Sequence, residues 1–189
     1  MSRGYFQKFQ IRDVVFLAIM SAVALATCAV MPLVISLQPL IFGISQLVTA
    51  LQIGVFFAIG LYKVRKPGSL LIMALMMGLI QLMMSPPMFL SSVLNGVLIE
   101  LIVLLLFRGY ERDAAVFVAA MLHTPLSLPF NYLYNRLMKG ADSPLAAVAD
   151  RAPLAAVGMT LAVTAVSALG ALIGIKIARE LKKSGVLKK

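Results

Sequence analysis

Apolar residues along this chain fall into six long runs, and the short segments between them hold most of the charged side chains. A helix needs roughly 20 apolar residues to cross the hydrocarbon core of a bilayer, and all the runs but the third reach that length. We therefore expect an all-α integral membrane protein with six transmembrane helices. The predicted spans are residues 14–37, 40–62, 69–84, 87–107, 114–137 and 153–177.

The composition supports this prediction. Of the 189 residues, 61% are hydrophobic and only 13% are charged, which is far from the composition of a soluble globular domain. Six spans and their short loops leave no room for a soluble domain, so we expect one transmembrane domain over residues 1–189. The loop from Lys139 to Ala152 is the longest one and is expected to hold a short surface helix.

The positive charge of the chain sets its expected orientation. With six spans, all but three of the 17 Lys and Arg residues fall on the side that holds both termini; the exceptions are Arg136, Lys139 and Arg151. Basic loops stay in the cytoplasm, so both termini are predicted to be cytoplasmic in a multi-pass protein of the cell inner (plasma) membrane. The net charge of +10 is thus explained by topology, and we expect no nucleic-acid partner.

Polar residues inside the spans gather toward the predicted outer side. Polar groups in hydrocarbon are costly, so these side chains should face protein or a water-filled cavity. The inner half of the spans is almost entirely apolar, which predicts a small-molecule site open to the outside and sealed below. The predicted substrate-binding residues are Asn95, Glu100, His123, Asn131, Gln81, Gln46 and Tyr134.

Two alternatives apply to these polar residues. Amides within a membrane also bridge helices, and for Gln52 and Asn135 we favour that interpretation. Glu100 could instead form a buried pair with His123 that holds the fourth and fifth spans together. Along the fifth span His123, Ser127, Asn131 and Asn135 share one stripe of an unbroken helix, although Pro125 and Pro129 are expected to kink it.

Enzyme chemistry is not expected. The chain has one His, one Cys and one carboxylate within its spans, so paired acids, metal clusters and Cys/His nucleophiles cannot be assembled. We predict no metal and no cofactor. There is also no phosphate-binding loop, so energy for uptake would come from an ATPase partner or from an ion.

A ridge of small residues runs along the first span at Ala18, Ala22 and Ala26, spaced four apart. Such ridges let a second helix approach closely, within the bundle or from a partner protein.

Several short segments between about residues 11 and 113 form a distinctive set. They are Ile11-Arg12-Asp13-Val14-Val15, Arg65-Lys66-Pro67-Gly68, Gly78-Leu79-Ile80-Gln81, Met84-Ser85-Pro86, Asn95-Gly96, Glu100-Leu101 and Phe107-Arg108. Together they resemble the substrate-binding S components of energy-coupling factor (ECF) vitamin transporters, and more narrowly the YkoE-like branch associated with hydroxymethylpyrimidine and thiamine.

This resemblance implies a mechanism and partners. An S component binds a vitamin-like substrate near the outer face and docks through small residues of its first helix, here Ala18, Ala22 and Ala26, onto a transmembrane T subunit. Two ATP-binding subunits supply the energy. The chain has no Trp where the branch tends to place one, so ring stacking would fall to Tyr132, Tyr134, Phe89 or Phe130, and another small heterocyclic solute is also compatible.

Two other functions remain open at this stage. One is a solitary proton-coupled carrier in which Glu100 and His123 titrate. The other is a membrane scaffold without transport activity, whose amides only join helices.

Overall fold

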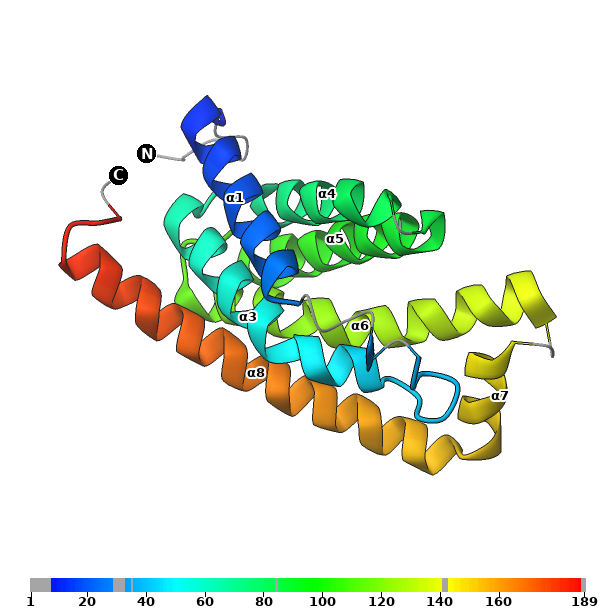
Figure 1. Cartoon of the computed structure of the whole chain (residues 1–189). Helices are drawn as coiled ribbons and strands as arrows, with labels where there is room; N and C mark the ends of the chain where they lie inside the picture. Colours follow the sequence, from blue (N-terminus) through cyan, green and yellow to red (C-terminus); the bar gives the residue numbers. More distant parts are fainter. Residues whose placement is uncertain (1–7, 29–32, 35, 84, 141–142, 188–189) are drawn as a thin grey trace.

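The computed structural model describes residues 8–28, 33–34, 36–83, 85–140 and 143–187, which form helices and connecting turns without strands (Figure 1). Four of these helices are long and apolar enough to cross a membrane: α3, α5, α6 and α8. The helices are α1 (Ile11–Thr27), α3 (Ile44–Val64), α4 (Ser69–Leu82), α5 (Pro86–Phe107), α6 (Asp113–Lys139), α7 (Pro144–Arg151) and α8 (Pro153–Lys183).

The helix boundaries confirm some sequence expectations and correct others. The predicted span 14–37 is too long as a helix, because α1 ends at Thr27 and Cys28 follows as its C-cap. The apolar character of the next residues extended the prediction beyond the helix. The short helix expected after Lys139 is confirmed as α7, whose N-terminus is capped by the Ser143 hydroxyl.

The fifth predicted span is one helix of 27 residues that contains both Pro125 and Pro129. A proline removes one backbone donor, and we expected the two prolines to kink the helix. The helix continues through both of them, from Asp113 to Lys139. The hydroxyl of Ser127 donates to the carbonyl of Thr124 at 2.7 Å. His123, Ser127 and Asn131 are spaced four residues apart on this one helix, as expected for a single stripe.

Helix α3 lies at the centre of the bundle, packed against α1, α6 and α8. Its contact with α8 is close because glycines of each helix face the backbone of the other helix. A Cβ atom on Gly174 would lie 2.5 Å from the carbonyl oxygen of Val55, and one on Gly54 would lie 2.8 Å from that of Ser167. Small residues at a membrane helix interface allow this approach, so the two helices hold each other in register.

Ion pairs join four chain segments at the end of the molecule where both termini lie (Figure 1). Asp113 accepts hydrogen bonds from Arg65 and from Arg179, the latter at 2.7 Å. The Lys66 ammonium lies 2.6 Å from a carboxylate oxygen of Asp13. The start of α1, the α3–α4 turn, the α5–α6 turn and the end of α8 therefore meet at one end, which we call the basic end.

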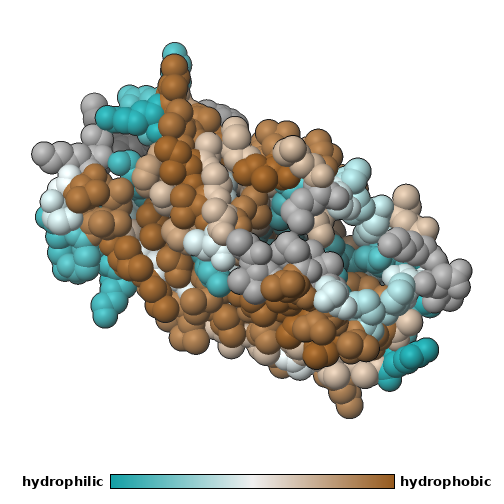
Figure 2. Space-filling model, viewed as in Figure 1, coloured by the Kyte–Doolittle hydropathy of each residue, from teal (hydrophilic) through white to brown (hydrophobic). Residues whose placement is uncertain are grey.

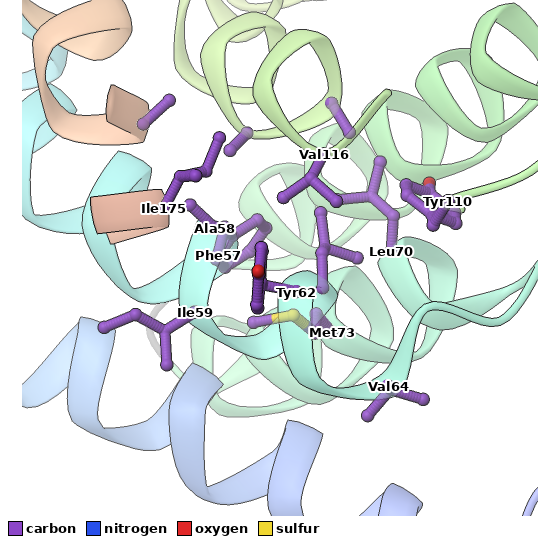
Figure 3. Close-up of a cluster of buried hydrophobic side chains, with 14 of the residues drawn as sticks. Phe57, Ala58, Ile59, Tyr62, Val64, Leu70, Met73, Tyr110, Val116 and Ile175 are labelled. Carbon is purple, nitrogen blue, oxygen red and sulfur yellow. The ribbon is translucent and has the colours of Figure 1, made fainter. Parts of the chain in front are cut away.

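An apolar core fills the half of the bundle next to the basic end (Figure 3). Phe57, Leu61, Leu70 and Met73 are fully buried there. The face seen in Figure 2 is also largely apolar, with most hydrophilic side chains toward its two ends. Leu154 of α8, for example, is 88% exposed, as expected of a side chain that faces lipid rather than water.

Candidate functional site

A cavity of about 630 Å³ lies in the half of the bundle opposite the basic end. It is lined by the C-terminal halves of α1 and α4, the middle and C-terminal part of α6, the N-terminal halves of α3 and α5, and Leu145 of α7. Its volume is in the range of small-molecule sites. The same helices thus form an apolar core at one end and a hollow at the other.

The structure places six of the seven predicted binding residues around this cavity. They come from four helices: Gln46 on α3, Gln81 on α4, Asn95 on α5, and His123, Asn131 and Tyr134 on α6. Side chains that are distant in sequence therefore line one hollow, as expected if polar groups within a membrane avoid lipid.

Within the part of the chain that the structure describes, three residues that line the cavity carry a buried polar atom without a hydrogen-bond partner: Asn95 at Oδ1, His123 at Nε2 and Thr124 at Oγ1. These three residues are each at most 5% exposed. A buried polar group without a partner costs about 1–3 kcal/mol. Because these residues belong to the cavity wall, they are candidates for hydrogen bonds to a bound molecule.

His123 lies at the boundary between the cavity and the apolar core. Its ring packs against Phe57, with ring centroids 4.4 Å apart and planes tilted by 60°. Phe57 is fully buried in the core cluster. The aromatic contact restricts the imidazole ring, whose Nε2 atom is buried without a hydrogen-bond partner.

A hydrogen-bonded group on α3 and the preceding turn forms another part of the wall. The Ser45 hydroxyl donates to Gln46 Oε1 at 2.8 Å and accepts from the amide of Gln38. The Thr49 hydroxyl donates to the Ser45 carbonyl at 2.9 Å. These bonds hold Gln46 in one orientation, so this wall is ordered before any ligand arrives.

Sequence analysis did not select several residues that line the cavity. Most of them lie within one helical turn of a residue that it did select, and the others lie in the adjoining connections. Their spacing from the predicted residues was the signal that could have identified them. Asn135, for which the sequence favoured helix bridging, donates to the Asn131 carbonyl at 2.8 Å and also lines the cavity. The polar residues missed were Gln38, Ser45, Thr49, Ser85, Ser91, Ser92, Thr124, Ser127 and Asn135.

Glu100 is the exception among the predicted binding residues, because it does not line the cavity. Its carboxylate accepts from the backbone N–H of Gly68 at 2.6 Å and from the Tyr110 hydroxyl at 2.9 Å. Gly68 is the N-cap of α4 and has no side chain to cap that helix. The structure therefore gives Glu100 a capping role, and the alternative pairing with His123 is not formed.

Of the four aromatic residues considered for ring stacking, only Tyr134 lines the cavity. The Tyr132 hydroxyl instead donates to Asp150 of α7 at 2.7 Å. Phe89 packs at Gly78, where an added Cβ would lie 3.1 Å from the phenyl ring. Tyr134 and His123 are thus the two aromatic rings along the described wall.

The alanine ridge of α1 lies partly on the surface. Ala22 and Ala26 are exposed and also line the cavity, whereas Ala18 is half-buried and does not line it. Val15 and Ile19, each 50% exposed, continue the same apolar face. This side of α1 is accessible to a partner helix.

Bundle and cavity together define a helical integral membrane protein with a small-molecule-sized hollow between its helices, lined by apolar side chains and a set of neutral polar ones. A family model covers residues 11–183, and the chain belongs to this family, Trep_Strep, described as hypothetical bacterial integral membrane proteins. Comparison with curated proteins gave no match. Among solved structures, the chain resembles an S component of an ECF transporter, with a TM-score of 0.64 and 21% identity over 95% of this chain and 89% of the other. The chain therefore has the fold of an S component.

Proposed function

We propose that this protein is the substrate-binding S component of an ECF-type, ATP-driven importer of a vitamin or similar micronutrient. The observation that carries the proposal is the cavity, in which Asn95, His123 and Thr124 present buried polar atoms without partners. The S-component fold of the matched structure supports it. Thiamine or its hydroxymethylpyrimidine precursor is the substrate that the narrower sequence resemblance suggests.

The proposed topology has six crossings, with both termini in the cytoplasm and the cavity open to the outside of the plasma membrane. The ion pairs support it, because they gather four basic segments at one end, opposite the cavity. Helices α1 and α4, with 17 and 14 residues, are shorter than a full span. At 1.5 Å per residue they extend about 26 and 21 Å, so neighbouring turns complete their crossings in this proposal.

The proposed partners are a transmembrane T subunit and two ATP-binding subunits, and the surrounding phase is the lipid bilayer. The chain itself lacks a phosphate-binding loop, so ATP hydrolysis belongs to the partners. The accessible face of α1 with Ala18, Ala22 and Ala26 is the proposed docking surface.

Ala18→Trp is the sharpest test of this docking surface, since Ala18 belongs to the ridge but does not line the cavity. We expect the bulky ring to prevent close helix approach, so that the variant loses co-purification with the T and ATP-binding subunits and ATP-dependent uptake. Binding of substrate to the isolated subunit should stay unchanged. Leu161→Trp on α8 is the control, because Leu161 is also exposed, at 66%, but lies on another helix. Full uptake by Ala18→Trp would remove α1 as the docking surface.

The rival functions make different predictions. A proton-coupled carrier with Glu100 and His123 as its titrating pair loses its structural basis, because Glu100 is held by Gly68 and Tyr110. Uptake that stops when an uncoupler is added and that needs no ATPase would support the proton-coupled carrier instead. A scaffold without transport activity would show neither ligand binding nor association with the ATPase module.

A further inference from the structure

We infer that the cavity selects an uncharged solute, and that it excludes carboxylates, phosphates and fixed cations. Of the two substrates named above, this favours neutral hydroxymethylpyrimidine over thiamine, whose thiazolium ring is a fixed cation. This inference rests on the proposed function, which it deepens by naming the substrate class. Every described residue that lines the cavity is neutral: its polar groups are amides, hydroxyls, a thiol and one imidazole. No Asp, Glu, Lys or Arg is among these lining residues.

A charged ligand in such a site would lose its hydration without gaining an opposite charge. The cost of burying an unpaired ion exceeds that of burying a hydrogen-bonded neutral group by several kcal/mol. Sites that bind anions or cations tightly instead supply Arg, Lys or carboxylate partners. The neutral wall is therefore a selectivity feature and not simply a polar surface.

Among the side chains that the structure describes, three charged ones near the cavity wall in sequence are occupied elsewhere. Arg136 follows the lining residue Asn135, but it pairs with Asp150 of α7 at 2.9 Å. The carboxylate of Asp150 also accepts from the Tyr132 hydroxyl. Glu100, on the same helix as Asn95, has both oxygens bound to Gly68 and Tyr110. Each of these charges is thus held in a contact outside the wall.

The unpaired atoms indicate what the solute carries. Asn95 Oδ1 is a buried acceptor without a partner on a residue of the wall, and an N–H or O–H donor of the ligand would satisfy it. The Thr124 hydroxyl and the amides of Gln81 and Asn131 can donate to ligand carbonyl or ring-nitrogen acceptors. Apolar side chains fill the remaining wall: Leu25, Ile53, Met77, Ile80 and Met88. A small neutral heterocycle with both amide-like donors and acceptors matches this combination.

Compounds that differ mainly in charge test the inference on the full chain, purified in detergent. Nicotinamide is compared with nicotinate, an anion, and with 1-methylnicotinamide, a cation; uracil is compared with orotate, and hydroxymethylpyrimidine with its phosphate and with thiamine. We expect a neutral member of the panel to raise the midpoint of thermal unfolding, because a ligand that binds the folded state stabilises it. Its charged counterparts should bind on the order of a hundredfold more weakly. A charged member that binds as tightly as its neutral counterpart overturns the inference, as does a panel without any neutral binder.

Two matched variants connect the effect to the cavity. Asn95→Leu removes the unpaired acceptor at the wall, and we expect affinity for the neutral binder to fall by about 10- to 100-fold. Gln52→Leu removes an equally unpaired buried oxygen that does not line the cavity, and affinity should be unchanged. Equal affinity of Asn95→Leu and the natural chain would contradict the assignment.

The inference and the proposed function can fail separately. Association with the T and ATP-binding subunits does not depend on which ligand is bound. If the chain assembles with that module but prefers a charged compound, the substrate class is wrong and the S-component function stands. If it binds neutral compounds selectively but never assembles with the module, the S-component function is wrong and the substrate class stands.

Discussion

The glycine contact between α3 and α8 allows a quantitative test of the fold that positions the cavity. In Gly174→Ala the new Cβ would lie 2.5 Å from the Val55 carbonyl oxygen and 2.8 Å from Ala58 Cβ. Neither helix backbone can move aside without opening the interface. Gly158 lies on the same helix and is exposed, and a Cβ added there would have no neighbouring atom within 4 Å, so Gly158→Ala is a matched control.

The two substitutions should change stability in opposite directions. Replacing a helical glycine by alanine gains about 0.5–1 kcal/mol through reduced chain entropy, and this is the whole effect expected at Gly158. At Gly174 the steric strain, about 3 kcal/mol because the obstacle is backbone, exceeds that gain and leaves a net loss of about 2 kcal/mol. The variants should therefore differ by about 3 kcal/mol in the free energy of unfolding.

Thermal unfolding in one detergent measures this difference. At about 2–4 °C per kcal/mol for a chain of this size, the midpoints should differ by about 6–12 °C, with Gly158→Ala equal to or above the natural chain. Ligand affinity should also fall in Gly174→Ala, because α3 carries Ser45, Gln46 and Thr49 of the wall. Equal midpoints for the two variants would show that the helices do not approach as closely as the structure has them.

Two further predictions concern charged groups near the basic end. Glu100→Gln should lower the free energy of unfolding by about 1–3 kcal/mol, because only one of the two terminal atoms of an amide can accept a hydrogen bond, whereas the carboxylate accepts from both Gly68 N–H and Tyr110. Affinity for the neutral ligand should stay unchanged. A loss of affinity without a loss of stability would instead place Glu100 in the binding site. Burial alone would raise the pKa of Asp13, but hydrogen bonds from Lys66 and from the Gln10 backbone outweigh it, so this pKa lies below its usual value of 3.8. The stabilisation from the Asp13–Lys66 pair is therefore complete above the unfolded-state pKa of Asp13, and it is lost as the pH falls through the lower folded-state pKa. The free energies of unfolding of the natural chain and Lys66→Ala, measured by denaturant titration, should accordingly become equal at acidic pH.

Sequence reasoning located the cavity residues because the cost of polar groups in lipid depends only on residue type and depth. Gln46, Gln81 and Asn95 stand out in apolar runs, and antiparallel helices bring equal depths together. The same reasoning misplaced Glu100. Its depth along its own helix was evident, but its partner is a backbone N–H of Gly68, and a backbone donor carries no sequence signal.

Helix boundaries show a similar limit. Hydropathy identified the long apolar helices, but it could not end α1 at Thr27, because the residues that follow are apolar as well. The expectation of a kink in α6 came from local proline geometry, which does not tell whether the helix continues beyond the prolines. The helix runs through Pro125 and Pro129 and packs against α3, α5 and α8, contacts that single-sequence patterns do not contain.

The two sides of α8 are under different evolutionary constraints. None of its described residues lines the cavity, and its glycines bind it to α3 along one side. Its opposite side, with Leu154, Leu161 and Leu169, can therefore change as bilayer thickness or lipid saturation changes between habitats, with recognition of the nutrient left intact. Related chains adapted to different membranes should accordingly vary along this outer stripe while keeping the glycine side of the same helix.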